Sequence, residues 1–284
     1  NADVAKVGGK NASLGEMIQH LQEAGIRVPG GLATTAQALW HFRDSNDLRE
    51  PITDKFALFD NGDVTLEETG DAIRRLIRKA EFADDLATAI RSAYHALARE
   101  SGEKQPAVAV RSSATAEDLP QASFAGQQES YLNVSGEAAL IDACRRCIAS
   151  LFTHRAIMYR ENHGFDHMQV ALSVGVQQMV RADTGGSGVM FSIDTESGFP
   201  DAVLINAAWG LGENVVQGAV DPDEYEVFKP FLDDETKVPI LEKALGAKKI
   251  KMIHDRDGTP RNVPTSKAER AAFVLSDTEI LTLA

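Results

Sequence analysis

The chain has 284 residues, with 29 Lys and Arg against 42 Asp and Glu, which gives a net charge of −13 at pH 7. Hydrophobic residues at 43% and charged residues at 25% are typical of folded globular domains and exclude a disordered or collagen-like chain. The acidic balance also argues against a nucleic-acid partner, so a phosphate site would have to be local.

The apolar stretches, the first residues and the cysteine content do not suggest a membrane or secreted protein. The longest apolar stretch near the middle, 202–209, is far shorter than the roughly 18 residues of a spanning helix. The start at Asn1 has neither an initiator Met nor a signal peptide, so we expect the native chain to begin upstream. The low number of cysteines, two, indicates a reducing compartment, and we expect a cytoplasmic location.

The first hundred residues are expected to be mainly helical. Apolar residues recur at helical spacing from Leu14 to Leu21, behind Gly8 and Gly9, which places Lys10 at or near a helix N-terminus. A second helix is expected after Thr35, and the stretch 51–63 is expected to be irregular. Two amphipathic helices are predicted next, at 66–79 and 82–98.

The pattern changes at Pro106, where a short buried strand, 107–110, leads into Arg111 and a small-residue loop that ends near Gln128. A returning strand is predicted at 131–134, then helices at 137–151 and 153–161. The remaining candidates are strands, at 170–180, 187–193, 202–209, 225–229 and 249–254. We place the division between a mixed lobe, 1–164, and a sheet-rich lobe, 165–284, near Gly164.

Two basic residues stand where a polyphosphate could be bound. Lys10 near a helix N-terminus can act as a point charge, and Arg111 at the end of a strand can act as a bidentate donor. The alternative is a turn with a solvated helix start, and a surface arginine. Gly8-Gly9-Lys10 lacks the Walker spacing, so the sequence does not support a P-loop.

Three other patterns have plainer interpretations. Cys144 and Cys147 have C-x-x-C spacing inside a predicted helix without a second pair, which favours core packing over a redox or zinc site. The acidic runs 194–196 and 221–224 could hold Mg²⁺ or form turns, and turns are the favoured interpretation. We assign no residue as a metal ligand.

Seven segments carry a pattern known from one family. They are VGGKNASLGEM at 7–17, VPGGLATT at 28–35, VAVRSSATAEDLP at 108–120, ASFAGQQ at 122–128, SGVMFSIDTESGF at 187–199, GLGENVVQG at 210–218 and DPDEY at 221–225. Together they resemble phosphoenolpyruvate synthases, also called pyruvate, water dikinases. The resemblance covers nearly the whole chain and is collinear with the N-terminal nucleotide-binding domain of that family.

The resemblance implies an α+β, ATP-grasp-like fold of two lobes with ATP between them, truncated at its C-terminal end. It implies conversion of ATP, pyruvate and water to AMP, phosphoenolpyruvate and phosphate, with Mg²⁺ bridging the ATP phosphates. The β-phosphoryl group would pass to a histidine on a swivelling domain and then to pyruvate in a barrel domain. These two domains of the same enzyme are the implied partners, and the resemblance also allows a homodimer.

The same resemblance assigns the nucleotide contacts. It implies that Lys10 and Arg111 are catalytic and bind the phosphates. Gly126 and Ser130 would line the nucleotide. Gln177 would contact the adenine, and Glu213 the ribose. Ser130 stands where relatives often carry Thr. The chain ends before the family's acidic and Gln-Ala-Arg segment and before the carrier histidine, so this fragment alone is expected to be inactive.

Two alternatives remain open. A rifampin phosphotransferase shares the loop at 111–120 but phosphorylates an antibiotic hydroxyl, whereas the segments 194–199 and 11–17 look more like the synthase. Pyruvate, phosphate dikinase is disfavoured because its relatives usually carry a Gly- and Met-rich loop after the Arg-Ser pair. A nucleotide-binding regulatory module without chemistry is the other alternative.

Overall fold

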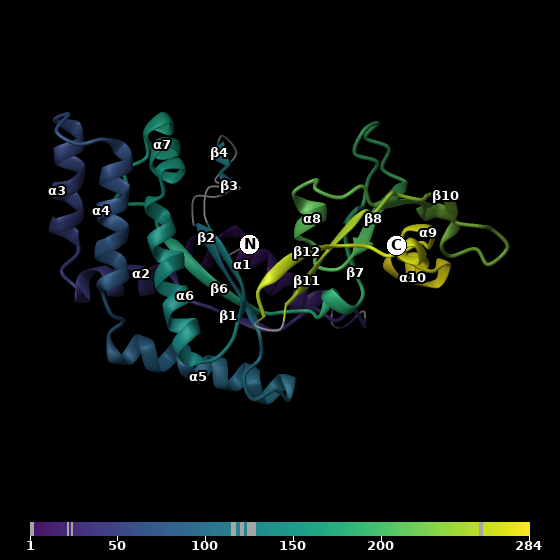
Figure 1. Ribbon diagram of the computed structural model, residues 1–284, viewed down its shortest axis with the longest axis horizontal. Coiled ribbons are helices and arrows are strands. Elements are labelled where there is room, and N and C mark those ends of the chain that lie inside the picture. Colours follow the sequence, from purple (N-terminus) through teal and green to yellow (C-terminus); the bar gives the residue numbers. More distant parts are fainter. Residues whose placement is uncertain are drawn as a thin grey trace. The chain divides into compact units, whose positions relative to one another are not determined.

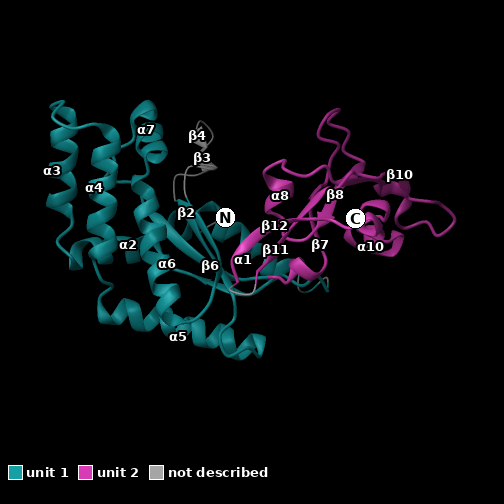
Figure 2. Cartoon of the chain, viewed as in Figure 1, with its two compact units in different colours: residues 1–179 teal, residues 180–284 magenta. Residues whose placement is uncertain are grey.

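The protein is described by a computed structural model that covers residues 3–21, 23, 25–114, 129–255 and 258–284, and the backbone alone at 118–119 and 122–123. The chain divides into unit 1, residues 1–179, and unit 2, residues 180–284 (Figure 1, Figure 2). Both contain helices and antiparallel sheet, which confirms the α+β class. The sequence analysis placed the division near Gly164, but strand β6 (Leu172–Gln178) follows that residue and pairs within unit 1.

Unit 1 is built on a four-stranded antiparallel sheet. Its strands, in spatial order, are β1 (Gly31–Ala33), β6, β2 (Val108–Ala114) and β5 (Ser130–Val134). Side chains along a strand alternate between the two faces of the sheet. Val108 and Val110 are fully buried on one face, where they join the hydrophobic core formed with the helices. The alternate residues of β2, Ala109, Arg111 and Ser113, lie on the opposite face and have short or polar side chains.

Helices surround this sheet. They are α1 (Val4–Leu21), α2 (Ala36–Ser45), α3 (Arg49–Asp60), α4 (Leu66–Lys79), α5 (Asp84–Ser101), α6 (Glu137–Ala149) and α7 (His154–His163). A short hairpin, β3 (Asp118–Leu119) with β4 (Ala122–Ser123), lies between β2 and β5 in sequence. Helix α4 has the predicted bounds, and a capping box between Thr65 and Glu68 satisfies the backbone at its start.

Helix α3 occupies a stretch that the sequence analysis wrongly expected to be irregular. The helix begins at Arg49, so Pro51 lies in its first turn, where the missing N–H has no intrahelical partner to lose. Ile52 and Phe56, one turn apart, are both buried in the core. Pro51 therefore marks the start of a helix and does not interrupt one.

The two thiols of the chain lie in helix α6 and are free and buried. Burial raises the pKa of Cys144 to about 12 and also raises the pKa of Cys147. Thiols in this state are poor nucleophiles and poor metal ligands. The C-x-x-C spacing therefore reflects core packing, as the sequence indicated.

Helix α7 contributes a fully buried arginine, Arg160. Its Nε donates to Nδ1 of His167 at 2.9 Å, and its guanidinium carbon lies 5.5 Å from the ring centroid of Phe152. Among the described residues, Nη1 and Nη2 of Arg160 have no hydrogen-bond partner. Burial lowers the pKa of Arg160 to about 10. Because Nδ1 of His167 accepts this bond, the histidine is neutral and its Nε2–H donates to Glu161.

We expect unit 1 to lose stability as the pH falls below neutrality, through His167. Burial lowers the pKa of this histidine from its usual 6.5, and the hydrogen bond that it donates to Glu161 acts in the opposite direction. Below pH 6.5 His167 of the unfolded chain binds a proton, whereas folded His167 stays neutral down to its lower pKa. Lowering the pH therefore lowers the free energy of unfolding until the folded pKa is passed. Urea unfolding at several pH values measures the slope. His167→Gln should flatten it, and an unchanged slope in the variant would contradict this assignment.

Unit 2 contains a second four-stranded antiparallel sheet. Its strands, in spatial order, are β10 (Ile240–Ala244), β9 (Asp223–Phe228), β8 (Ala202–Trp209) and β7 (Gly186–Phe191). A separate hairpin pairs β11 (Ile250–His254) with β12 (Pro260–Pro264), and the helices are α8 (Glu213–Val216), α9 (Lys267–Ala271) and α10 (Asp277–Leu283). Alternate residues of β8, beginning with Val203, pack against β9 and against Ile280 of α10.

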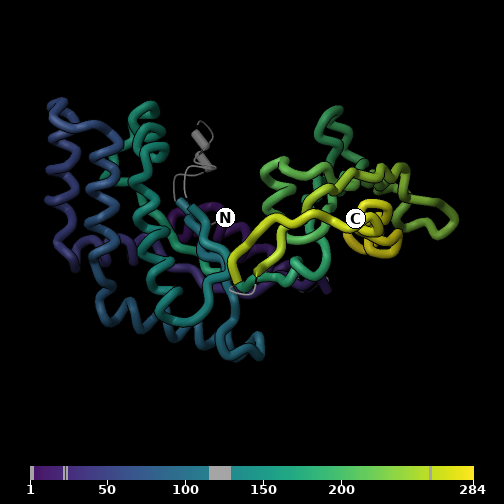
Figure 3. The backbone as a smooth tube through the Cα atoms, viewed as in Figure 1, coloured from purple at the N-terminus to yellow at the C-terminus, as the bar shows by residue number. Residues whose placement is uncertain are grey.

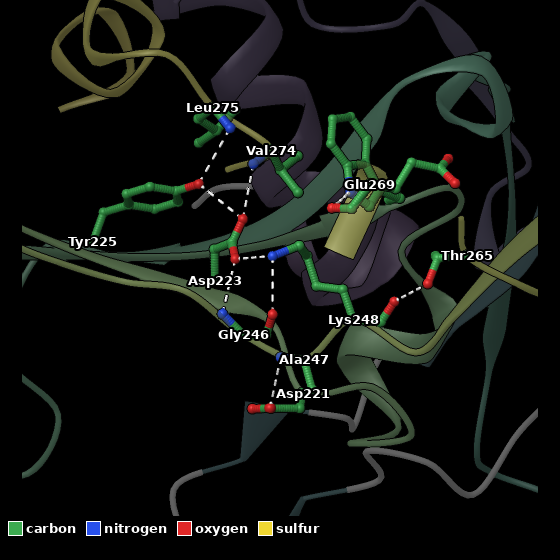
Figure 4. A network of polar contacts seen from close by, with 11 residues as sticks. Asp221, Asp223, Tyr225, Gly246, Ala247, Lys248, Thr265, Glu269, Val274 and Leu275 are labelled. Carbon is green, nitrogen blue, oxygen red and sulfur yellow. Dashed lines mark hydrogen bonds and ion pairs between the residues drawn. The ribbon is translucent and has the colours of Figure 1, made fainter. Parts of the chain in front are cut away.

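A buried ion pair lies at the start of β9 (Figure 4). Nζ of Lys248 donates to Oδ1 of Asp223, and both side chains are fully buried. The hydroxyl of Tyr225 donates to the second oxygen of Asp223 at 3.2 Å. Asp223 and Tyr225 also accept hydrogen bonds from backbone N–H groups, those of Gly246 (2.9 Å), Val274 (2.8 Å) and Leu275 (3.2 Å). The network thus joins β9 to the segments that precede β11 and α10.

Among the described residues, no helix has the length and apolar character required to cross a bilayer.

Candidate functional site

The sheet of unit 1 gathers three of the predicted site residues on one face. Arg111 of β2 lies directly opposite Ser130 of β5 and opposite Gly175 of β6 in the antiparallel register. Directly opposed residues in such a sheet point to the same face, as do residues two positions apart along a strand. Gln177 therefore shares this face with Arg111 and Ser130.

Helix α1 packs on the same face and carries Lys10. The segments 4–21, 108–114 and 172–178 lie side by side although they are far apart in sequence (Figure 3). Gly8 breaks the helix with φ 75° and ψ 164°, so regular helix starts directly after it, and Lys10 lies in the first turn. This confirms the predicted position of Lys10. The N–H groups of a first turn carry partial positive charge, to which the exposed ammonium of Lys10 adds.

The close approach of α1 to the sheet depends on Gly8. An added Cβ at Gly8 would lie 2.3 Å from Oγ and 2.4 Å from the backbone oxygen of Ser113. A positive φ is also costly for any residue with a Cβ. Glycine at this position therefore sets how closely Lys10 lies to strand β2.

A pocket of about 160 Å³ lies between α1 and the sheet. Leu14 and Ile18 of α1 form part of its apolar wall, and its polar lining comes from Asn11, Arg111 and Gln177. An apolar wall with a few convergent polar groups is typical of a small-molecule site.

Arg111 and Gln177 contact each other directly. Nη2 of Arg111 donates to Oε1 of Gln177 at 2.5 Å, and Nε2 of Gln177 donates to the backbone oxygen of Pro29 at 3.3 Å. The bond to Pro29 fixes the orientation of the Gln177 amide, because only its nitrogen can donate. Gln177 thus holds the guanidinium of Arg111 over the sheet, a contact that the sequence did not predict.

Four of the six predicted residues belong to the described part of unit 1. Gly126 lies outside the described residues. Glu213 belongs to unit 2, where it begins helix α8 and its Oε1 accepts a hydrogen bond from Gln217 at 2.6 Å. Lys10, Arg111, Ser130 and Gln177 are the four that unit 1 places on one face.

Sequence reasoning gave no role to the polar residues beneath Lys10. Asn11, Ser113 and Ser173 form hydrogen bonds where α1 meets the sheet. Asn11 and Ser113 lie inside two of the matching segments, 7–17 and 108–120, whereas Ser173 lies in none of them. A hydrogen bond between residues 162 positions apart in the chain has no local sequence signature.

The described residues offer no metal cage. Among them, no group of three or more His, Cys, Asp and Glu could hold a metal ion. Asp194 accepts the N–H of Glu196 at 3.0 Å within a turn, and Asp221 accepts the N–H of Ala247 at 2.8 Å. Asp194 and Asp221 therefore each satisfy a backbone N–H group in a turn or between segments.

Comparison with known proteins gives a consistent result. The family model described as pyruvate phosphate dikinase, AMP/ATP-binding domain, matches residues 4–284. The chain is 55% identical over 289 residues to the phosphoenolpyruvate synthase of Synechocystis sp., and 52% identical over 291 residues to that of Helicobacter pylori. It is 49% identical over 289 residues to the phosphoenolpyruvate synthase of Escherichia coli.

These alignments cover almost all of this chain and a smaller part of each relative. They include 99% of this chain and 35% of the Synechocystis protein, 100% and 35% for Helicobacter pylori, and 99% and 36% for Escherichia coli. The chain therefore spans about a third of the length of these relatives.

Proposed function

The chain belongs to the family of pyruvate phosphate dikinase AMP/ATP-binding domains, and from that premise we propose that it is the ATP-binding part of a phosphoenolpyruvate synthase. The family gives it an ATP-grasp-type fold. The observation that carries the proposal is the placement of Lys10, in the first turn of α1, on the same sheet face as Arg111. Two cations and a helix N-terminus on one face favour a polyphosphate ligand.

The proposed reaction converts ATP, pyruvate and water to AMP, phosphoenolpyruvate and phosphate. A histidine outside this chain would take the β-phosphoryl group, water would take the γ-phosphoryl group, and pyruvate would then receive the phosphoryl group from the histidine. Phosphoryl transfer depends mainly on positioning and on neutralisation of phosphate charge, which is the role proposed for Lys10 and Arg111. Mg²⁺ would accompany the ATP phosphates.

The other site residues keep more limited proposed roles. Ser130, directly opposite Arg111, and Gly126 would line the nucleotide, and Glu213 would contact the ribose. Gln177 would lie by the adenine, and its bond to Arg111 supports a second role in orienting the guanidinium. The swivelling histidine domain, the pyruvate-binding barrel and a homodimer remain proposed partners, and the free buried thiols support a reducing, cytoplasmic location.

Product analysis on the full-length protein tests this function. With Mg²⁺, ATP and pyruvate, we expect AMP and phosphate to form in a pyruvate-dependent reaction. A rifampin phosphotransferase would instead require the antibiotic as acceptor, and a regulatory module would bind ATP without turnover. ADP as the sole nucleotide product would exclude the proposed reaction.

Arg111→Met should weaken ATP binding by about 10- to 100-fold, because a charge-assisted contact to phosphate contributes roughly 1.5–3 kcal/mol. Isothermal titration of the full-length protein with ATP measures the change. Arg91→Met is the matched control, since Arg91 forms a half-exposed pair with Glu137 of α6 and does not line the pocket. Equal ATP affinity in the Arg111 variant and the wild type would remove Arg111 from the phosphate site.

A further inference from the structure

Asn11, the residue after Lys10, connects helix α1 to two strands of the sheet. Its backbone N–H donates to Oγ of Ser113 on β2 at 3.3 Å. Its side-chain Nδ2 donates to Oγ of Ser173 on β6 at 2.9 Å. Ser113 and Ser173 are themselves buried, so both bonds lie at the protected contact between helix and sheet.

The first of these bonds replaces a helix cap. A helix normally begins with a side chain that accepts an N–H of its first turn, and Gly8 at the break of α1 has no side chain. Ser113 of β2 supplies that oxygen from another element. The start of the regular helix is therefore satisfied only when α1 is seated on the sheet.

The second bond has a fixed direction. The hydroxyl of Ser173 donates to the backbone oxygen of Thr34, which can only accept. Ser173 must therefore accept from Asn11, which directs Nδ2 of the amide toward Ser173. The acceptor is held in place because Val174 donates its N–H to the hydroxyl of Thr34 at 2.9 Å, and Thr34 donates its own N–H to Val174 at 3.0 Å.

The remaining atom of the amide packs against glycine. An added Cβ at Gly175 of β6 would lie 2.3 Å from Oδ1 of Asn11, so only glycine leaves room for the side chain. Gly175 is also the residue directly opposite Arg111 in the register. Asn11 therefore contacts the backbone of the strand residue that pairs with Arg111.

We propose that Asn11 is a positioning residue: it fixes the backbone of Lys10 relative to Arg111, so that both cations can contact the polyphosphate part of the ligand. This inference rests on the proposed nucleotide-binding function. Lys10 itself has a long, flexible side chain, and its reach toward phosphate is set by where its Cα is fixed. Misplacement of a positioning element by about 1 Å can reduce phosphoryl transfer about 100-fold.

A double-mutant cycle on the full-length protein tests the inference, with ATP and adenosine as the probes. Asn11→Ala is expected to weaken ATP binding about tenfold and to change adenosine binding less than twofold. In a Lys10→Met background the same substitution should change ATP binding less than twofold, because residues that act through one another are non-additive.

Two further variants separate positioning from stability. Ser173→Ala removes the acceptor, leaves Asn11 intact and should shift the ATP-to-adenosine affinity ratio in the same direction. Asn46→Ala is the matched structural control, because Asn46 donates to the backbone oxygens of Phe42 and Glu81 at 2.8 Å each. It should lower the melting temperature without changing that ratio.

The outcomes distinguish this inference from the function on which it rests. Additive losses in the cycle, or equal losses of ATP and adenosine affinity, would show that Asn11 has a structural role only and would overturn the inference. If Lys10→Met left ATP affinity unchanged, the proposed phosphate site would fail first and the inference with it. If Asn11→Ala did not fold, Ser173→Ala would decide by the same criteria.

Discussion

Replacing Lys248 by methionine is expected to destabilise unit 2 by about 3–5 kcal/mol, the cost of leaving a buried charge without its partner. Asp223 would lose the buried ammonium that pairs with it, and the hydroxyl of Tyr225 and the N–H groups of Gly246 and Val274 would be left as its donors. Lys248 itself has φ 40°, a strained value for a residue with a side chain, which only a well-determined surrounding maintains. Loss of the ion pair therefore also releases the local backbone.

Urea unfolding combined with amide hydrogen exchange of β8 and β9 measures this effect. Lys243→Met is the matched control: Lys243 pairs with Asp277, but its side chain is 30% exposed and that of its partner 68%. Exposed pairs contribute about 1 kcal/mol or less. Similar losses in the two variants would mean that the buried pair has no special importance for the stability of unit 2.

Gly8→Ala is expected to destabilise unit 1 by about 2–5 kcal/mol and to displace the start of α1 from the sheet. A positive φ costs about 1–2 kcal/mol for a residue with a Cβ, and forced overlap in a packed contact costs about 1–3 kcal/mol more. The overlap is with backbone atoms of Ser113, which cannot rotate away. Because Lys10 follows the break, ATP affinity should fall in the same variant.

Gly15→Ala provides a control in the same helix. No atom lies within 4 Å of an added Cβ at Gly15, so alanine should fit and stabilise the helix by about 0.5–1 kcal/mol. Thermal unfolding of both variants, with ATP titration alongside, gives the comparison. A Gly8 variant as stable as the Gly15 variant would contradict the close contact between α1 and β2.

Elements with strong periodicity were predictable from the sequence, and elements defined by distant partners were not. Helix α4 and strand β8 have the predicted bounds because each carries an unambiguous apolar repeat. Helix α3 was missed because the stretch 51–63, which begins with a proline, was expected to be irregular. Strand β6 was predicted, but its pairing with β1 and β2 was not, since register depends on residues far away in the chain.

The candidate site shows the same limit. The resemblance pointed to Lys10 and Arg111, and the structure brings their elements together. It did not indicate that Gln177 holds Arg111, or that Asn11 is bonded to Ser173. Polar side chains such as these have no periodicity to reveal them, because their roles come from the contact between two elements and not from either element alone.

The burial of both thiols in helix α6 has a practical consequence for studying the two units. The chain contains no cysteine besides Cys144 and Cys147, so every group that reacts with a maleimide or an aromatic disulfide belongs to unit 1. The rate of covalent labelling in native buffer therefore reports the opening of unit 1 and is silent about unit 2. The natural sequence thus provides a selective chemical probe, which needs no engineered residue and leaves the proposed nucleotide-binding face of the sheet unmodified.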